Sequence, residues 1–182
     1  MYFTVNNNSN YDYLFNYLND NTLEMDVSIY FSSKVKEDEI EVKCDNHKIM
    51  LKPRKIVFGI GCRRGKSKDE IKKAIEKVLD DLNMDKSRID MLSSAEIKKD
   101  EQGILDLSYE LNVSVNFVDL DRLKLFKSND IQESDFVKSK FGIAGVCEPS
   151  ALITAGFNSK LIYKKTAFDG VTVSVALGEN KK

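Results

Sequence analysis

Histidine and cysteine, the side chains that form most zinc sites and many nucleophilic centres, are scarce in this chain of 182 residues. His47 is the single histidine, which argues against a histidine-rich metal site and against a Ser-His-Asp triad. The three cysteines, Cys44, Cys62 and Cys147, have no Cys-x-x-Cys spacing, which argues against structural zinc and fits a reducing compartment. We expect His47, in Cys44-Asp-Asn-His47, to lie at the tip of a hairpin.

Long apolar runs and an excess of basic charge are also missing. No stretch approaches the roughly 20 apolar residues of a membrane-spanning helix, and the polar start Met1–Asn10 does not resemble a signal peptide. We therefore expect a soluble, cytoplasmic protein without a membrane partner. The net charge of −1 and the pI of about 6.0 argue against a general nucleic-acid binder. With 42% apolar residues, the chain can bury a core of one medium domain with a smaller appendage.

The first 53 residues predict a small α+β segment. Tyr11–Leu18 has the apolar spacing of a helix, and Met25–Phe31 and Glu39–Leu51 alternate like half-buried strands. Pro53 marks the boundary, because a proline pushes the preceding residue toward extended conformations. The sequence thus predicts two domains, 1–53 and 54–182.

From Arg54 onward, strands and helices alternate, which predicts a three-layer α/β sandwich with a mostly parallel sheet. The expected strands are Ile56–Ile60, Ile89–Leu92, Val115–Leu120, Leu161–Lys165 and Val171–Leu177. The expected helical segments are Lys68–Leu82, one containing Ile104–Leu111, turns near Leu123–Phe126 and Ser134–Phe141, and one with Pro149 in its first turn that ends at Gly156. The last two strands are expected to pair antiparallel about Asp169-Gly170.

The most informative segment is Lys55-Ile-Val-Phe-Gly-Ile-Gly-Cys-Arg-Arg-Gly-Lys-Ser67, a glycine-rich turn between a strand and a charged helix that Ser67 is expected to cap. Glycines let the backbone approach a ligand closely, and the carboxyl end of such a strand is where open α/β sheets bind ligands. The segment therefore predicts an anion-binding turn formed by Gly61, Cys62, Arg63, Arg64 and Gly65. The alternative is a strand-to-helix turn whose arginines only face solvent.

Two phosphate-binding signatures fail on this segment by one residue each. A P-loop needs four residues before Gly-Lys-Ser, but Gly59 and Gly65 enclose five and Gly61 and Gly65 enclose three. A dinucleotide fingerprint would need its third glycine one position before Gly65. A nucleotide or a phosphate sugar therefore remains only an alternative ligand.

Cys62 is the sharpest nucleophile candidate, because a cysteine beside two arginines at a helix N-terminus is expected to have a lowered thiol pKa. The alternative is a small cysteine that packs under the turn.

Three turns are expected on one rim of the sheet: Gly61–Ser67, Ser93–Gly103 and Gly142–Ser150. Asp100, Glu101 and Glu148 are candidate general bases if burial raises a pKa toward neutrality, and helix capping is the alternative for each. The candidate hydrogen-bonding groups for a ligand are Ser93, Ser94 and Ser150, which are expected to bind or cap and not to act as nucleophiles.

Four motifs occur in order along the chain: Gly59-Ile-Gly-Cys-Arg-Arg-Gly65, Ser93-Ser-Ala-Glu-Ile-Lys-Lys-Asp-Glu-Gln-Gly103, Gly145-Val-Cys-Glu-Pro-Ser-Ala-Leu152, and Lys165 with Val171-Thr-Val173. Together they resemble the C-terminal domain of the cobalamin-biosynthesis protein CbiG, which also occurs alone as CobE. The resemblance covers about residues 54 to 178. CbiG proteins usually carry further N-terminal regions, whereas only about 53 residues precede the matching part here. The resemblance therefore implies that residues 1–53 are a remnant of the middle region and that the chain is a fragment.

The resemblance implies the activity of cobalt-precorrin-5A hydrolase, which opens the δ-lactone of a cobalt tetrapyrrole and expels acetaldehyde to give cobalt-precorrin-5B. The substrate carries its own cobalt, so no cofactor is implied. Glu101 or Glu148 is expected to activate water, while Arg63, Arg64 and the turn amides hold carboxylates or the oxyanion. The alternative is a non-catalytic cobalt-precorrin carrier. Expected partners are the tetrapyrrole, a second copy of the chain and other cobalamin-pathway enzymes.

Overall fold

The computed structural model describes residues 28–29, 40–44, 47–51, 54–128, 131, 139, 141–143 and 145–180. The chain divides into two compact units, one formed by Met1–Pro53 with Asn180–Lys182 and the other by Arg54–Glu179. The expected helices at Tyr11–Leu18 and Ser134–Phe141 lie outside the described residues, apart from positions 139 and 141.

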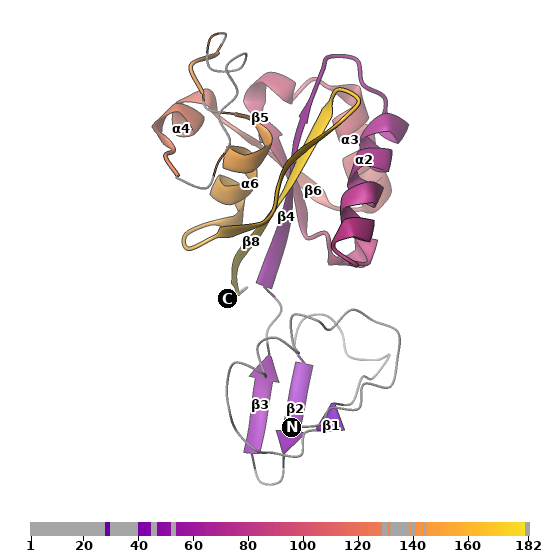
Figure 1. Ribbon diagram of the computed structural model, residues 1–182, viewed down its shortest axis with the longest axis vertical. Helices are drawn as coiled ribbons and strands as arrows, with labels where there is room; N and C mark the ends of the chain where they lie inside the picture. The colour runs from indigo at the N-terminus through magenta and orange to yellow at the C-terminus, as the bar shows by residue number, and fades with distance from the viewer. Residues whose placement is uncertain are drawn as a thin grey trace. The chain divides into compact units, whose positions relative to one another are not determined.

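The described part of the smaller unit is an antiparallel sheet in the order β1-β2-β3, formed by Ser28–Ile29, Ile40–Cys44 and His47–Leu51 (Figure 1). Cys44 pairs with His47 at the end of the β2–β3 ladder. The predicted hairpin, with His47 beside its turn, is therefore confirmed.

The larger unit contains a five-stranded sheet in the order β6-β5-β4-β8-β7. Its strands are β4 (Arg54–Cys62), β5 (Met91–Ala95), β6 (Ser114–Val118), β7 (Lys160–Phe168) and β8 (Val171–Asn180). The β4–β5 and β5–β6 pairs are parallel, and β7 pairs antiparallel with β8 as expected.

β8 runs against β4. At one end of the pair Arg54 donates to the carbonyl of Gly178, and at the other end Thr172 donates to the carbonyl of Gly61. The sheet is therefore mixed, and the prediction of a mostly parallel sheet holds only for β4, β5 and β6. The predicted α/β sandwich itself is confirmed.

Helices cover both faces of this sheet, which makes three layers (Figure 1). α2 (Lys68–Asp81) and α3 (Gln102–Leu111) lie on one face, and α6 (Cys147–Ala155) lies on the other; α4 (Leu120–Leu125) follows β6, and short 3₁₀ turns lie at Lys86–Arg88 and Glu96–Lys98. Ser67 caps α2 through a capping box with Glu70, as the sequence predicted.

The core follows the alternation of side chains along β4. Ile56, Phe58 and Ile60 pack with the apolar stripes of α2 and α3, while Val57 packs with residues of α6. Because both faces of β4 are covered, the strand is apolar throughout its middle instead of alternating with polar residues.

Gly59 allows α6 to lie directly against β4. A Cβ atom at this position would collide with the carbonyl oxygen of Cys147 and would lie 2.9 Å from the Cβ of Ala151. Both of these partners belong to the first half of α6, so the absence of a side chain at Gly59 sets how closely the helix approaches the sheet.

We predict that Gly59→Ala lowers the free energy of unfolding by about 1–3 kcal/mol, because the added methyl must push α6 away from a close-packed sheet. Urea denaturation of the full chain measures the change. Glu76→Ala, on the exposed face of α2, is the control and is expected to stay within about 0.5 kcal/mol of the wild type. Equal stability of the Gly59 variant and the control would contradict the role given to Gly59.

Candidate functional site

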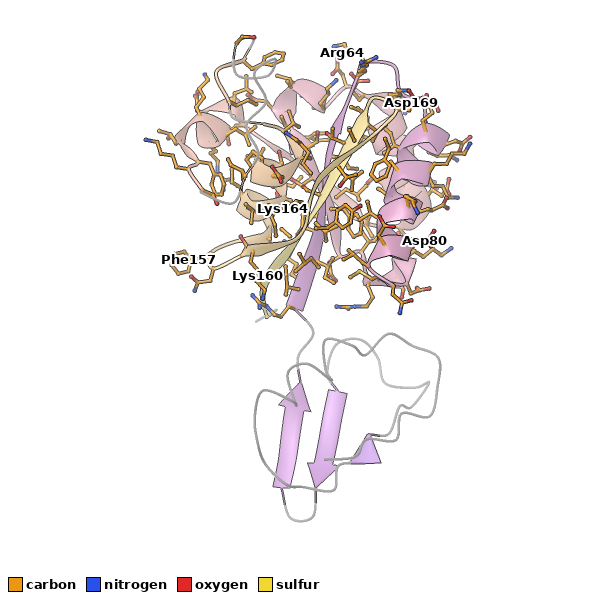
Figure 2. All side chains as sticks on the ribbon, in the orientation of Figure 1. Arg64, Asp80, Phe157, Lys160, Lys164 and Asp169 are labelled. Atoms are coloured by element: carbon orange, nitrogen blue, oxygen red, sulfur yellow. The ribbon has the colours of Figure 1, made fainter. Side chains whose placement is uncertain are left out.

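The glycine-rich turn after β4 and the segment between β5 and α3 meet at the carboxyl end of the parallel strands. The Gly65 N–H donates to Glu101 Oε2 at 3.0 Å, and Arg64 Nη1 lies 3.1 Å from Asp100 Oδ2. Figure 2 shows Arg64 and Asp169 at this end of the larger unit and Phe157 and Lys160 toward the other end. Two of the three turns predicted for one rim are therefore in direct contact.

The start of α6 reaches the same rim from the other face. A Cβ on Gly61 would lie 3.5 Å from the Cβ of Val146, the residue before α6, and 2.5 Å from Thr172 Oγ1. The third predicted turn thus joins the first two, and the β7–β8 hairpin, which the sequence did not place here, joins them through Thr172.

The two arginines of the turn have different surroundings. Arg64 pairs with Asp100 and also donates to the carbonyl of Ile97 at 3.3 Å, and the hydrogen bond to Asp100 raises the pKa of its guanidinium. The Arg63 backbone donates to the carbonyl of Gly170 at 2.9 Å, but its side chain is exposed and forms no ion pair with any side chain that the structure describes. Both guanidinium groups are thus exposed, and they differ in that Arg64 is paired whereas Arg63 has no ion-pair partner among the described side chains.

Glu101 is 5% exposed and bridges several donors. Besides the Gly65 N–H, it accepts from Lys98 Nζ at 3.1 Å, and Arg64 Nη1 lies 3.6 Å from the same oxygen. Burial raises the pKa of the Glu101 carboxyl, but the hydrogen bonds from Gly65 and Lys98 and the nearby positive charges outweigh burial, so the pKa lies below its ordinary value. The raised pKa that the sequence required of a general base is absent at Glu101.

The other two candidate carboxylates face different partners. Asp100 is largely exposed, and its hydrogen bond with Arg64 lowers its pKa. Glu148, in the first turn of α6, is 1% exposed and accepts the backbone N–H of Lys165 in β7 at 2.9 Å. Glu148 thus ties α6 to the hairpin.

Cys62 does not have the lowered thiol pKa that its arginine neighbours suggested. Burial at the end of β4 raises its pKa, and this effect exceeds the opposing charges of Lys98, Arg64 and Lys66. Cys62 packs against the core beside α2 and α3. The expectation of an activated thiolate is wrong, and the alternative of a cysteine packed under the turn describes what the structure shows.

The three candidate serines are buried and not in a turn. Ser93 and Ser94 lie within β5, so their predicted place in a turn is wrong. Ser93 Oγ bonds to the carbonyl of Ser150 and to Thr154, and Ser94 Oγ donates to the carbonyl of Ile60. Ser150 lies in α6 with its hydroxyl buried. The Ser93 and Ser94 hydroxyls thus join β5 to α6 and β4, whereas the Ser150 hydroxyl has no hydrogen-bond partner among the described residues.

Sequence reasoning missed two groups at the rim. Lys98 is buried against Glu101. The sequence pattern that could have indicated this pair is the spacing of three residues between the lysine and the glutamate within one of the four motifs. Lys66 Nζ bonds to Glu70 and lies 3.6 Å from Asp169 at the hairpin tip. No local pattern indicates that second contact, because it joins residues that are distant in the chain.

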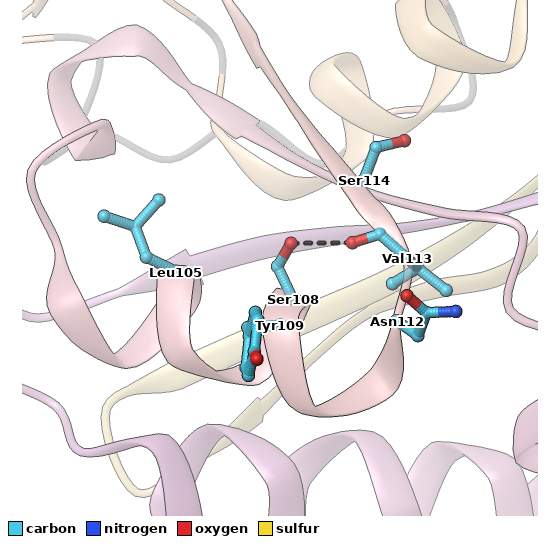
Figure 3. A pocket seen from close by; sticks show the side chains of 6 residues that line it. All are labelled: Leu105, Ser108, Tyr109, Asn112, Val113 and Ser114. Atoms are coloured by element: carbon cyan, nitrogen blue, oxygen red, sulfur yellow. Dashed lines mark hydrogen bonds between the residues drawn. The ribbon is translucent and has the colours of Figure 1, made fainter.

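A shallow hollow lies near the start of β6 and the end of α3, formed by Leu105, Ser108, Tyr109, Asn112, Val113 and Ser114 (Figure 3). Since β6 is the edge strand and is parallel to β5, this hollow lies at the end of the sheet opposite the rim. Ser108 donates its hydroxyl hydrogen to the carbonyl of Val113 within it. The hollow therefore is not part of the candidate site.

Within the described residues, no group of three or more His, Cys, Asp and Glu side chains is arranged to hold a metal ion. Among the same residues, no helix has the length and apolar character needed to cross a membrane.

Comparison with known proteins identifies the family. The family model described as "Cobalamin synthesis G C-terminus" matches residues 56–176. The chain belongs to this family. Its membership associates the chain with cobalamin biosynthesis and confirms the resemblance to CbiG and CobE.

Three relatives illustrate the similarity of this CbiG C-terminal domain. A probable cobalt-precorrin-5A hydrolase of Methanocaldococcus jannaschii is 33% identical over 147 residues, which are 76% of this chain and 45% of that protein. A cobalt-precorrin-5A hydrolase of Priestia megaterium is 34% identical over 71% of this chain and 34% of that protein. The crystal structure of CobE, from the cobalamin biosynthetic pathway, matches with a TM-score of 0.66 and 26% identity over 71% of this chain and 94% of that one. The chain thus spans less than half the length of the two hydrolases.

We predict that iodoacetamide alkylates Cys62 more slowly than free cysteine at pH 7, because a raised thiol pKa leaves less thiolate. The rate is expected to rise at a higher pH than the rate for free cysteine, because burial raises the pKa of the Cys62 thiol. Peptide mass spectrometry separates Cys62 from Cys44 and Cys147. Alkylation of Cys62 faster than that of free cysteine at pH 7 would restore it as a nucleophile.

Proposed function

We propose that this CbiG-type chain acts in cobalamin biosynthesis by opening the δ-lactone of cobalt-precorrin-5A with release of acetaldehyde, giving cobalt-precorrin-5B. The observation that carries the proposal is the exposed Arg63 guanidinium on the turn after β4, which has no ion-pair partner among the described side chains. The names of the two curated relatives support the choice of reaction.

Arg63 is suited to bind a carboxylate of the tetrapyrrole, because a guanidinium forms paired hydrogen bonds with a carboxylate. The backbone amides contribute less than the sequence suggested. The N–H groups of Arg63 and Gly65 already donate to Gly170 and Glu101, and Arg64 is paired with Asp100. Recognition of the substrate's acetate and propionate groups thus falls first to the Arg63 side chain.

The reaction needs a base that takes a proton from water while the water oxygen attacks the lactone carbonyl. The bond between the acyl carbon and the ring oxygen then breaks, leaving a carboxylate and an alkoxide on the methylated meso carbon. The alkoxide becomes the carbonyl group of acetaldehyde as the carbon–carbon bond to the macrocycle breaks, and the electron pair of that bond stays on the macrocycle. The candidate bases are Glu101 and Glu148, both of them buried. Replacing each by glutamine and measuring acetaldehyde tests which one, if either, performs this step.

The second candidate function is a non-catalytic cobalt-precorrin carrier. It is favoured by the match to CobE, which this chain covers almost completely, whereas the chain covers less than half of the hydrolases. The proposed partners, a second copy of the chain and other cobalamin-pathway enzymes, and the cytoplasmic location apply to both functions.

Incubation of the full chain with cobalt-precorrin-5A separates the two functions. Acetaldehyde formation, measured together with the absorbance spectrum, supports the hydrolase. A spectral change that saturates without acetaldehyde supports the carrier, and the absence of both signals would contradict both.

We predict that Arg63→Ala raises the Kd for cobalt-precorrin-5A by about 10- to 100-fold, the loss expected for a charge-assisted hydrogen bond of roughly 1.5–3 kcal/mol. Absorbance titration measures the Kd. Lys73→Ala removes a positive charge from the exposed face of α2 and is expected to bind like the wild type. If both variants weaken binding equally, Arg63 has no specific role and only the overall charge matters.

A further inference from the structure

Glu101 is the residue before α3, a position whose side chain usually caps its own helix. Here the helix receives no such cap, and the carboxylate reaches across to the glycine-rich turn. One oxygen accepts the Gly65 N–H at 3.0 Å and the other accepts Lys98 Nζ at 3.1 Å. Gly65 has a φ of +77°, a backbone conformation that glycine adopts readily because it has no side chain. The hydrogen bond to Glu101 therefore restrains the turn at a residue whose backbone is otherwise free to change conformation.

Lys98 makes this buried contact possible. The side chains of Lys98 and Glu101 are only 11% and 6% exposed, and an unpaired carboxylate at such a place would be costly. The ammonium keeps the carboxylate ionised, and an ionised carboxylate is the stronger acceptor for the Gly65 N–H. Lys98 therefore stabilises the turn indirectly, by keeping Glu101 ionised.

Gly103 brings the same segment against the exit of the turn. A Cβ on Gly103 would collide with the carbonyl oxygen of Lys66 and would lie 3.1 Å from the backbone nitrogen of Lys68. The spacing Lys98-x-x-Glu101-x-Gly103 thus supplies a cation, an acceptor and a close backbone approach to one turn.

We infer that Lys98 and Glu101 are positioning residues, which hold the turn so that the Arg63 guanidinium faces the ligand, and that Glu101 does not activate water. The part that concerns the ligand rests on the proposed function. The two oxygens of Glu101 are directed at partners within the protein, Gly65 and Lys98, and the residue is only 5% exposed, which leaves an attacking water little access to the carboxylate.

Glutamine and alanine at position 101 separate the two roles. Glu101→Gln keeps an oxygen that accepts the Gly65 N–H, so we expect its Kd for cobalt-precorrin-5A and its acetaldehyde rate to stay within about tenfold of the wild type, while Glu101→Ala loses more than tenfold in Kd. A general base would behave differently, because Glu101→Gln would then lose about 10²- to 10⁴-fold in rate at unchanged Kd. That second pattern overturns the inference.

The Gly65 amide gives a readout that needs no tetrapyrrole. Its proton chemical shift is expected to follow the titration of Glu101 in acid, since the hydrogen bond is present when the carboxylate is ionised and weakens as the pH falls through the lowered pKa. Lys98→Met is expected to move the midpoint to higher pH, because Lys98 favours the ionised form. Lys99→Met, which removes a neighbouring exposed charge, is the control.

The ionisable groups that face the pair are Arg64 on the turn, Cys62 at the end of β4 and Asp100 beside Glu101. Cys62 stays protonated throughout the acid titration, and circular dichroism confirms that each variant is folded. The positioning role is overturned if the titration midpoint is unchanged in Lys98→Met, or if the Gly65 amide proton chemical shift does not follow the titration of Glu101. If the wild type binds no cobalt-precorrin, the proposed function fails, yet the Gly65 titration still decides whether Lys98 and Glu101 hold the turn.

Discussion

The burial of β4 on both faces is the constraint on which the larger unit depends. A strand with helices on each side must be apolar throughout, and it can lie close to a helix only where a side chain is missing. Ile56, Phe58 and Ile60 fill one side, and Gly59 admits α6 on the other. The glycine-rich turn begins where this strand leaves the core, so a rigid scaffold fixes where the turn starts.

From that starting point the turn is held from two directions. The segment before α3 contacts it through Glu101 and Asp100, and the tip of the β7–β8 hairpin contacts it through Gly170. These contacts pair the exposed Arg64 side chain with Asp100 and leave Arg63 without an ion-pair partner among the described side chains, although the two arginines are neighbours in the sequence. Tertiary hydrogen bonds, more than residue type, therefore distinguish the binding candidate from the structural residue.

Local patterns predicted the elements well where one signal dominated. The capping box at Ser67 and the 3.6-residue apolar stripe gave α2 nearly to the residue, and Asp169-Gly170 predicted the closing hairpin. The predicted end of β5 was wrong because Ser93 and Ser94 resemble turn residues, yet they stay in the strand where α6 and β4 supply acceptors for their hydroxyls. Those acceptors lie far away in the sequence.

The site was harder to predict than the fold, because charge and burial compete there. The basic neighbours of Cys62 suggested a lowered thiol pKa, but burial outweighs them. Glu101 shows the reverse, since burial alone would raise its pKa and the donors around it lower the pKa instead. The direction of each pKa shift depends on distances between groups that only the folded chain sets. The sequence could therefore identify these residues as candidates but could not predict the direction of their pKa shifts.

The hairpin contact also determines when the site can exist during folding. Thr172 reaches Gly61 across 111 residues of chain, and Gly170 meets Arg63 over a similar separation. Contacts this distant in sequence require a long loop to close before they are gained. During synthesis the turn leaves the ribosome long before β8 does, so a nascent chain carries the arginines without their final support. The turn thus gains its contacts with Thr172 and Gly170 only when β8 joins the sheet.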